Sequence, residues 1–169
     1  MTETPSSAST RTSAVIKASR QALYEAFTTP DALIAWQVPG EMTATLHAFD
    51  VRVGGGYRMS LFYPASEPGF PGKTTATEDR YTARFVELAS PGRIVEAITF
   101  DTTDPAFAGE MLMTVTLEEC SGGTGVTIVF DHLPPGIRPE DSDAGTRNSL
   151  AKLARYIESR ENLNVAAAT

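Results

Sequence analysis

The sequence predicts an α+β domain in which an antiparallel sheet of about six to seven strands curves around one long C-terminal helix. Two short helices are expected between the first strand and the rest of the sheet. Three features of the apolar pattern indicate this class. Apolar residues are spaced three and four apart near the C-terminus, they alternate with polar residues through the middle of the chain, and they show helical spacing again in two short segments after the first strand.

The 169 residues suffice for one domain with its own hydrophobic core. Residues 1–10 are mostly Ser, Thr and Ala and are expected to form a disordered tail. We therefore expect a single domain over residues 11–160, followed by a C-terminal tail over residues 161–169.

The first strand is predicted over residues 11–18, where small and apolar residues alternate with other side chains. Ser19 has the hydroxyl that an N-cap requires, so a short helix is expected directly after it. A second short helix is expected to begin at Pro30, because proline suits the first helical position. This helix carries Trp36 and must end before Pro39.

Six further segments alternate between apolar and polar residues and are separated by turn residues. They are Thr43–Val53, Gly56–Tyr63, Glu78–Leu88, Arg93–Phe100, Gly109–Glu118 and Gly125–His132. Short turns between consecutive strands imply antiparallel pairing, so the sheet is predicted to be a meander. The longest connection, residues 64–77, is interpreted as an ordinary hairpin connection, with a mobile lid as the alternative.

The long helix is predicted from Pro139 to Glu158. Leu150, Leu153 and Ile157 form one apolar stripe, which is typical of a helix that packs one face on a sheet. Acidic residues crowd the first turn, where the helix dipole favours them.

Charge and composition narrow the possible partners. The net charge of -7 and the isoelectric point near 4.8 argue against binding to nucleic acid or to an anionic membrane. No segment approaches 18 consecutive apolar residues, and Cys120 is the only cysteine, so a cytoplasmic protein without disulfides is expected. His47 and His132 fall in separate strands, so neither a metal site nor another cofactor is expected. A monomer and a homodimer remain equally open.

Several strand faces that we expect to point at the long helix carry methionine, aromatic and aliphatic residues. A curved sheet around one helix can leave a space that such side chains line, whereas an ordinary filled core is the alternative. The candidates for lining this cavity are Trp36, Met59, Glu96, Met111, Met113, Phe130, His132, Thr146, Arg147 and Leu150.

Three of these candidates are polar enough to orient a ligand. His132 is in phase with Phe130 and so points at the cavity mouth, but a histidine bonded to a loop carbonyl is the preferred interpretation. Arg147 would pair with a ligand carboxylate or with an acidic residue on the sheet. Glu96 is in phase with Ile94, which predicts a buried carboxyl of raised pKa if it points inward. A solvated residue that points outward is preferred.

Five segments, spread in order over residues 13–158, resemble one protein family. They are DVRVGGGYRM, ALYEAFTTPDALIAW, ELASPGRIV, MTVTLEECSGGTGVTIVF and GTRNSLAKLARYIE. The chain resembles the family named for the activator of the heat-shock-protein-90 ATPase, within the START-like (SRPBCC, birch-pollen-allergen-like) superfamily. This resemblance implies the helix-grip fold and a cavity that holds a ligand.

The chain departs from the family pattern at Thr146, where relatives often have tryptophan. The smaller side chain implies a roomier pocket or a different ligand. The preferred function is therefore the binding of a small hydrophobic or amphipathic molecule. A cofactor-free enzyme of the cyclase or hydrolase type, and a module that docks on a chaperone or another protein, are the alternatives.

Overall fold

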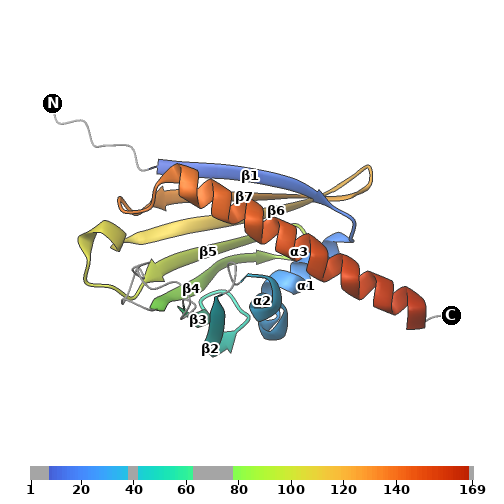
Figure 1. The fold of residues 1–169 in the computed structure, drawn as a ribbon, viewed down its shortest axis with the longest axis horizontal. Coiled ribbons are helices and arrows are strands. Elements are labelled where there is room, and N and C mark those ends of the chain that lie inside the picture. Colours follow the sequence, from blue (N-terminus) through green and yellow to red (C-terminus); the bar gives the residue numbers. More distant parts are fainter. Residues whose placement is uncertain (1–7, 38–41, 63–77, 168–169) are drawn as a thin grey trace.

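The computed structural model describes residues 8–37, 42–62 and 78–167, and the side chains among them as far as residue 160. Within these ranges the chain forms one seven-stranded antiparallel sheet and three α-helices. The longest helix lies across one face of the sheet (Figure 1). The predicted α+β helix-grip architecture is therefore confirmed.

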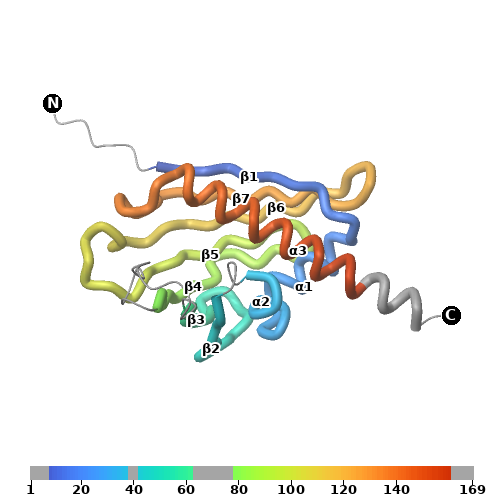
Figure 2. The backbone as a smooth tube through the Cα atoms, viewed as in Figure 1, coloured from blue at the N-terminus to red at the C-terminus, as the bar shows by residue number. Residues whose placement is uncertain are grey.

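The strand order in the sheet is β1-β7-β6-β5-β4-β3-β2. The strands are β1 (Ala8–Ile16), β2 (Thr43–Asp50), β3 (Gly56–Phe62), β4 (Glu78–Ala89), β5 (Arg93–Phe100), β6 (Glu110–Cys120) and β7 (Gly123–Leu133). Strands β2 to β7 form the predicted meander, and β1 pairs with β7, so the first and last strands are neighbours (Figure 2). Both edge strands, β1 and β2, thus come from the first part of the chain.

The helices begin where the sequence predicts. The helix α1 (Arg20–Thr28) is capped by the Ser19 hydroxyl, which accepts a hydrogen bond of 3.1 Å from the backbone N–H of Ala22. The helix α2 (Pro30–Trp36) starts at its proline, and α3 (Pro139–Ala167) does the same. A short 3-10 helix, η1 (Pro105–Phe107), lies in the connection between β5 and β6.

The regular structure extends into both predicted tails. Strand β1 begins at Ala8, so the last three residues of the predicted N-terminal tail belong to the sheet. Helix α3 continues past Glu158 to Ala167, through most of the predicted C-terminal tail. The connection over residues 64–77, interpreted as a hairpin connection or a lid, lies outside the described residues.

The core lies between the sheet and the helices. Leu150, Leu153 and Ile157 of α3 are each at most 5% exposed, as the predicted apolar stripe requires. Burying one such side chain contributes about 1.5–3 kcal/mol. The inner face of the sheet meets them with Tyr57, Met59, Phe85, Ile94, Ile98, Met111, Met113, Val115, Leu117, Val126 and Ile128.

Three register shifts interrupt the alternation of the strands. Strand β2 has an extra residue between Leu46 and Ala48, and β4 has one between Phe85 and Glu87. The third extra residue is on β7, where it faces Ala8 to Thr10 of β1. Each extra residue exchanges the faces of the positions that follow it. The strand predicted over Thr43–Val53 ends at Asp50, and Val51 and Val53 are exposed.

Candidate functional site: a buried carboxyl on the inner face of the sheet

Glu96 lies in the middle of β5 and points into the core. Its side chain is in phase with Ile94 and Ile98, and the residue is 1% exposed. Its register partners are Phe85 on β4 and Met113 on β6, both buried. The preferred prediction, an outward and solvated residue, is wrong, because the strand keeps its alternation through this position.

The carboxyl of Glu96 is buried with weak polar compensation from the Tyr57 hydroxyl. Neither carboxyl oxygen makes a hydrogen bond of good geometry with a described residue. Burial raises the pKa of Glu96 to about 7, and the neighbouring Tyr57 hydroxyl offsets part of this rise. At neutral pH the group therefore exists in both protonation states, with the Tyr57 hydroxyl as a polar neighbour.

Tyr57 on β3 is the second polar group of this site. The residue is 2% exposed, and its hydroxyl also has no hydrogen-bond partner among the described residues. Burial, with the nearby negative charge of Glu96 as a further cause, raises the pKa of Tyr57 well above its ordinary value. Tyr57 was not predicted as a site residue, although its position two residues before Met59 on the same strand face was a usable signal.

The apolar candidates lie in the same interior. Met59, Met111, Met113 and Leu150 are all buried, and Phe130 packs half-buried against the core. The Met59 sulfur accepts a hydrogen bond of 3.3 Å from the Tyr81 hydroxyl. The structure therefore brings these side chains to the face of the sheet that carries Glu96.

Trp36 is buried at the end of α2, where it has a structural partner. Its indole Nε1–H donates to the Ala26 carbonyl at 2.8 Å, and its ring packs edge-on against Phe27 at 4.8 Å between centroids. These contacts join α2 to α1 and leave the indole without a free donor.

The two candidate residues on the first turns of α3 point in different directions. Thr146 is buried, and its hydroxyl donates to the Ser142 carbonyl at 2.7 Å. Arg147 is exposed and donates to the Asp143 carboxylate at 2.9 Å, so it pairs within its own helix. The expectation that Arg147 faces the sheet is wrong, since one residue along a helix turns the side chain by about 100°.

His132 is exposed at the end of β7, and its backbone φ is +60°. Phe130 pairs with Thr10 of β1, and Leu133 pairs with Ala8. Strand β7 therefore has two residues between these pairs where β1 has one. This bulge turns His132 outward and places Leu133 in the core. The alternative interpretation, in which His132 points into a cavity mouth, is therefore wrong, and the preferred bond to a loop carbonyl stays a prediction.

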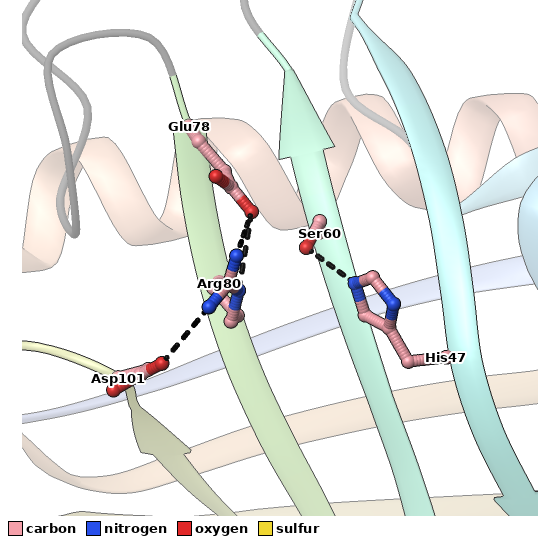
Figure 3. A network of polar contacts seen from close by, with 5 residues as sticks. All are labelled: His47, Ser60, Glu78, Arg80 and Asp101. Atoms are coloured by element: carbon pink, nitrogen blue, oxygen red, sulfur yellow. Dashed lines mark hydrogen bonds and ion pairs between the residues drawn. The ribbon is translucent and has the colours of Figure 1, made fainter.

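A second polar cluster lies on the outer face of the sheet (Figure 3). His47 Nε2 and the Ser60 hydroxyl are 2.7 Å apart, while Arg80 contacts Glu78 at 3.1 Å and Asp101 at 3.5 Å. A hydrogen bond from Ser60 is the largest of the contacts that lower the pKa of Glu78. The groups of this cluster satisfy one another, which distinguishes it from Glu96 and Tyr57.

A surface groove of about 300 Å³ lies where α1 and α2 meet α3, with Glu25, Asp31 and Arg160 among its lining residues. It contains none of the predicted cavity residues. Among the described residues there is no group of three or more potential metal ligands, and no described helix is long and apolar enough to cross a membrane.

The arrangement of a curved sheet, two short helices and a long covering helix agrees with the comparisons to known proteins. The family model described as "Activator of Hsp90 ATPase homolog 1-like protein" matches residues 17–158. The chain belongs to this family. As a member of the Hsp90 ATPase activator homolog 1-like family, it has a START-like fold, and domains of this fold generally bind ligands.

Solved structures show the same family fold. A protein from Chromobacterium violaceum is 31% identical, with a TM-score of 0.78 over 89% of this chain and 96% of the other. An AHSA1-like protein from Aeromonas hydrophila is 21% identical, with a TM-score of 0.69 over 91% and 94% of the two chains. A protein from Staphylococcus epidermidis has 18% identity and a TM-score of 0.73, with 95% of each chain covered. No protein with a curated functional description matches the chain.

Proposed function

We propose that this protein binds a small apolar or amphipathic molecule in a cavity between the inner face of the sheet and α3. The observation that carries the proposal is Glu96, a buried carboxyl with both oxygens unpartnered among the described residues. Burying a polar group without a hydrogen bond costs about 1–3 kcal/mol, and more when the group is charged. A ligand that donates a hydrogen bond to Glu96 recovers that free energy.

The side chains around Glu96 suit an adaptable binding site. Met59, Met111 and Met113 lie on the same face of the sheet. Methionine is unbranched and polarizable, so it conforms to ligands of different shape. The site therefore combines apolar, deformable walls with one polar end formed by Glu96 and Tyr57, which is the usual composition of a small-molecule pocket.

Native mass spectrometry of the purified protein tests the proposal directly. We expect a co-purifying small molecule, or an increase in melting temperature with members of a library of lipids and small aromatic compounds. The proposal would be contradicted if the protein carries no small molecule and no library member changes its melting temperature.

Filling the space beneath α3 gives a second test. Thr146→Trp places a large ring where α3 faces the sheet, because Thr146 is buried. We expect a folded protein whose affinity for the best library ligand falls at least about tenfold, which corresponds to about 1.4 kcal/mol. The measurement is titration calorimetry.

The matched control for this substitution is Asn148→Trp, on the exposed side of the same helix. It should bind as the unaltered protein does. If Thr146→Trp also binds with unchanged affinity, the ligand does not lie beneath the first half of α3.

Acid–base catalysis in the same interior is the second candidate function. A carboxyl whose pKa is about 7 can both give and take a proton at neutral pH, and Tyr57 supplies the second polar group that such a site needs. Screening with activated esters checks this: Glu96→Gln should abolish any turnover found, and the pH profile should titrate near 7. Turnover unchanged in Glu96→Gln would exclude Glu96 as its catalyst.

A further inference from the structure

Five aromatic rings form a continuous cluster beside Glu96. Phe49, Tyr57, Tyr81, Phe85 and Phe100 contact one another with ring centroids 5.8–6.4 Å apart. They come from β2, β3, β4 and β5, so the cluster spans one half of the sheet. The ring faces of Tyr and Phe carry negative partial charge and attract organic cations.

Glu96 lies at the border of this cluster. It is the register partner of Phe85, and its charge adds to the burial that raises the pKa values of Tyr57 and Tyr81. The Tyr81 hydroxyl is already engaged with the Met59 sulfur. Among the described residues, the carboxyl of Glu96 and the hydroxyl of Tyr57 therefore lie at the edge of an aromatic surface without a hydrogen bond of good geometry, as does the side-chain oxygen of Gln37 next to Tyr57.

The charge of the described interior has one sign. Asp79 and Glu96 are the buried Asp and Glu residues among the described side chains, and no described Lys or Arg is buried. A ligand carboxylate beside Glu96 would add a second negative charge in a medium of low dielectric constant, which is costly. A ligand ammonium group would instead pair with the carboxylate and donate hydrogen bonds to it.

From this combination we propose that the interior site is selective for amphipathic amines, whose ammonium group pairs with Glu96 while the apolar body lies against Tyr57, Tyr81 and Phe85. The inference rests on the proposed function and adds the ligand class to it. It excludes fatty acids and other anionic amphiphiles as preferred ligands.

Binding of an amine is linked to the protonation of Glu96. The ammonium group requires the ionised carboxylate, whereas Tyr57 and Tyr81, the titratable groups facing it, keep their protons because their pKa values are raised. With the pKa of Glu96 at about 7, affinity should rise about tenfold between roughly pH 6 and pH 8. A neutral ligand should show no such rise.

Three probes with the same alkyl chain, octylamine, octanol and octanoate, separate these possibilities by calorimetry. We expect octylamine to bind at least about tenfold more tightly than octanoate at neutral pH. Glu96→Gln and Glu96→Leu should both remove the preference for octylamine over octanol. The matched control, Glu118→Gln on the exposed end of β6, should keep it.

Two results have different meanings. The amine selectivity is overturned if octanol or octanoate binds at least as tightly as octylamine, or if Glu96→Gln keeps the preference for the amine. In either case the proposed function stands. If none of the three probes binds and the wider library is also silent, both proposals fail.

Discussion

At the scale of single residues, Glu96 makes the stability of the folded protein depend on pH. Its pKa is raised from 4.5 to about 7, so the unfolded chain loses this proton at lower pH than the folded chain. The contribution of Glu96 to the unfolding free energy therefore falls as pH rises from 4.5 to about 7 and changes no further above that. The shift corresponds to about 3 kcal/mol.

Glu96→Gln removes this titration. The unfolding free energy of the variant minus that of the unaltered protein should rise by about 3 kcal/mol between roughly pH 4.5 and pH 8. Urea unfolding at intermediate pH values measures it. The lowered pKa values of Glu78 and Asp143 act with the opposite sign, but they cancel in the difference. A difference that does not change with pH would show that Glu96 has an ordinary pKa in the folded state.

The sequence predicted this residue only in part. The phase of Glu96 with Ile94 and Ile98 correctly indicates the inward face, whereas the preferred interpretation was an outward, solvated residue. Conversely, the phase of His132 with Phe130 indicates the wrong face, because a bulge lies between them. Alternation along a strand thus predicts orientation only where no extra residue intervenes.

At the scale of elements, Gly54 and Gly56 in the turn between β2 and β3 are required for different reasons. Gly54 has a φ of +88° and open space where a Cβ would lie, so Gly54→Ala meets only backbone strain of about 1–2 kcal/mol. At Gly56 a Cβ would lie 1.9 Å from the Ala83 carbonyl oxygen on β4. Gly56→Ala should therefore cost clearly more than Gly54→Ala, because two paired strands must separate.

Thermal and urea unfolding of the two variants measure this difference, and each serves as the control for the other. Equal losses would mean that β3 and β4 can shift apart without cost. The GGG segment at residues 54–56 indicated this turn, and the alternation of apolar residues indicated every strand of the sheet. The register shifts in β2, β4 and β7 gave no comparable signal, since one extra residue leaves composition unchanged.

At the scale of the whole molecule, the N-terminal strand β1 contacts the last strand and the C-terminal helix of the described chain. Strand β1 pairs with β7, and the buried Thr12 hydroxyl on β1 donates to the Asp143 carboxylate on α3 at 2.6 Å. Helix α3 also contacts α1 and α2. The order of elements along the chain predicted the sheet and its covering helix, but not this closure, which combines the pairing of β1 with β7 and a contact between residues 131 positions apart.

Because the buried residues of α3 belong to the same hydrophobic core as the sheet, α3 should unfold together with the sheet. The variant Leu153→Ala tests this. It removes a side chain that is 0% exposed and should lower the unfolding free energy by about 2–5 kcal/mol. Asn148→Ala, on the exposed side of the same helix, should change it by less than about 0.5 kcal/mol. Far-ultraviolet circular dichroism follows the backbone, while Trp36 fluorescence reports the core next to α2. For Leu153→Ala, the unfolding curve measured by circular dichroism should coincide with the curve measured by fluorescence. If the circular dichroism signal is lost before the fluorescence changes, α3 can detach from the sheet, and the cavity proposed beneath it would then open without global unfolding.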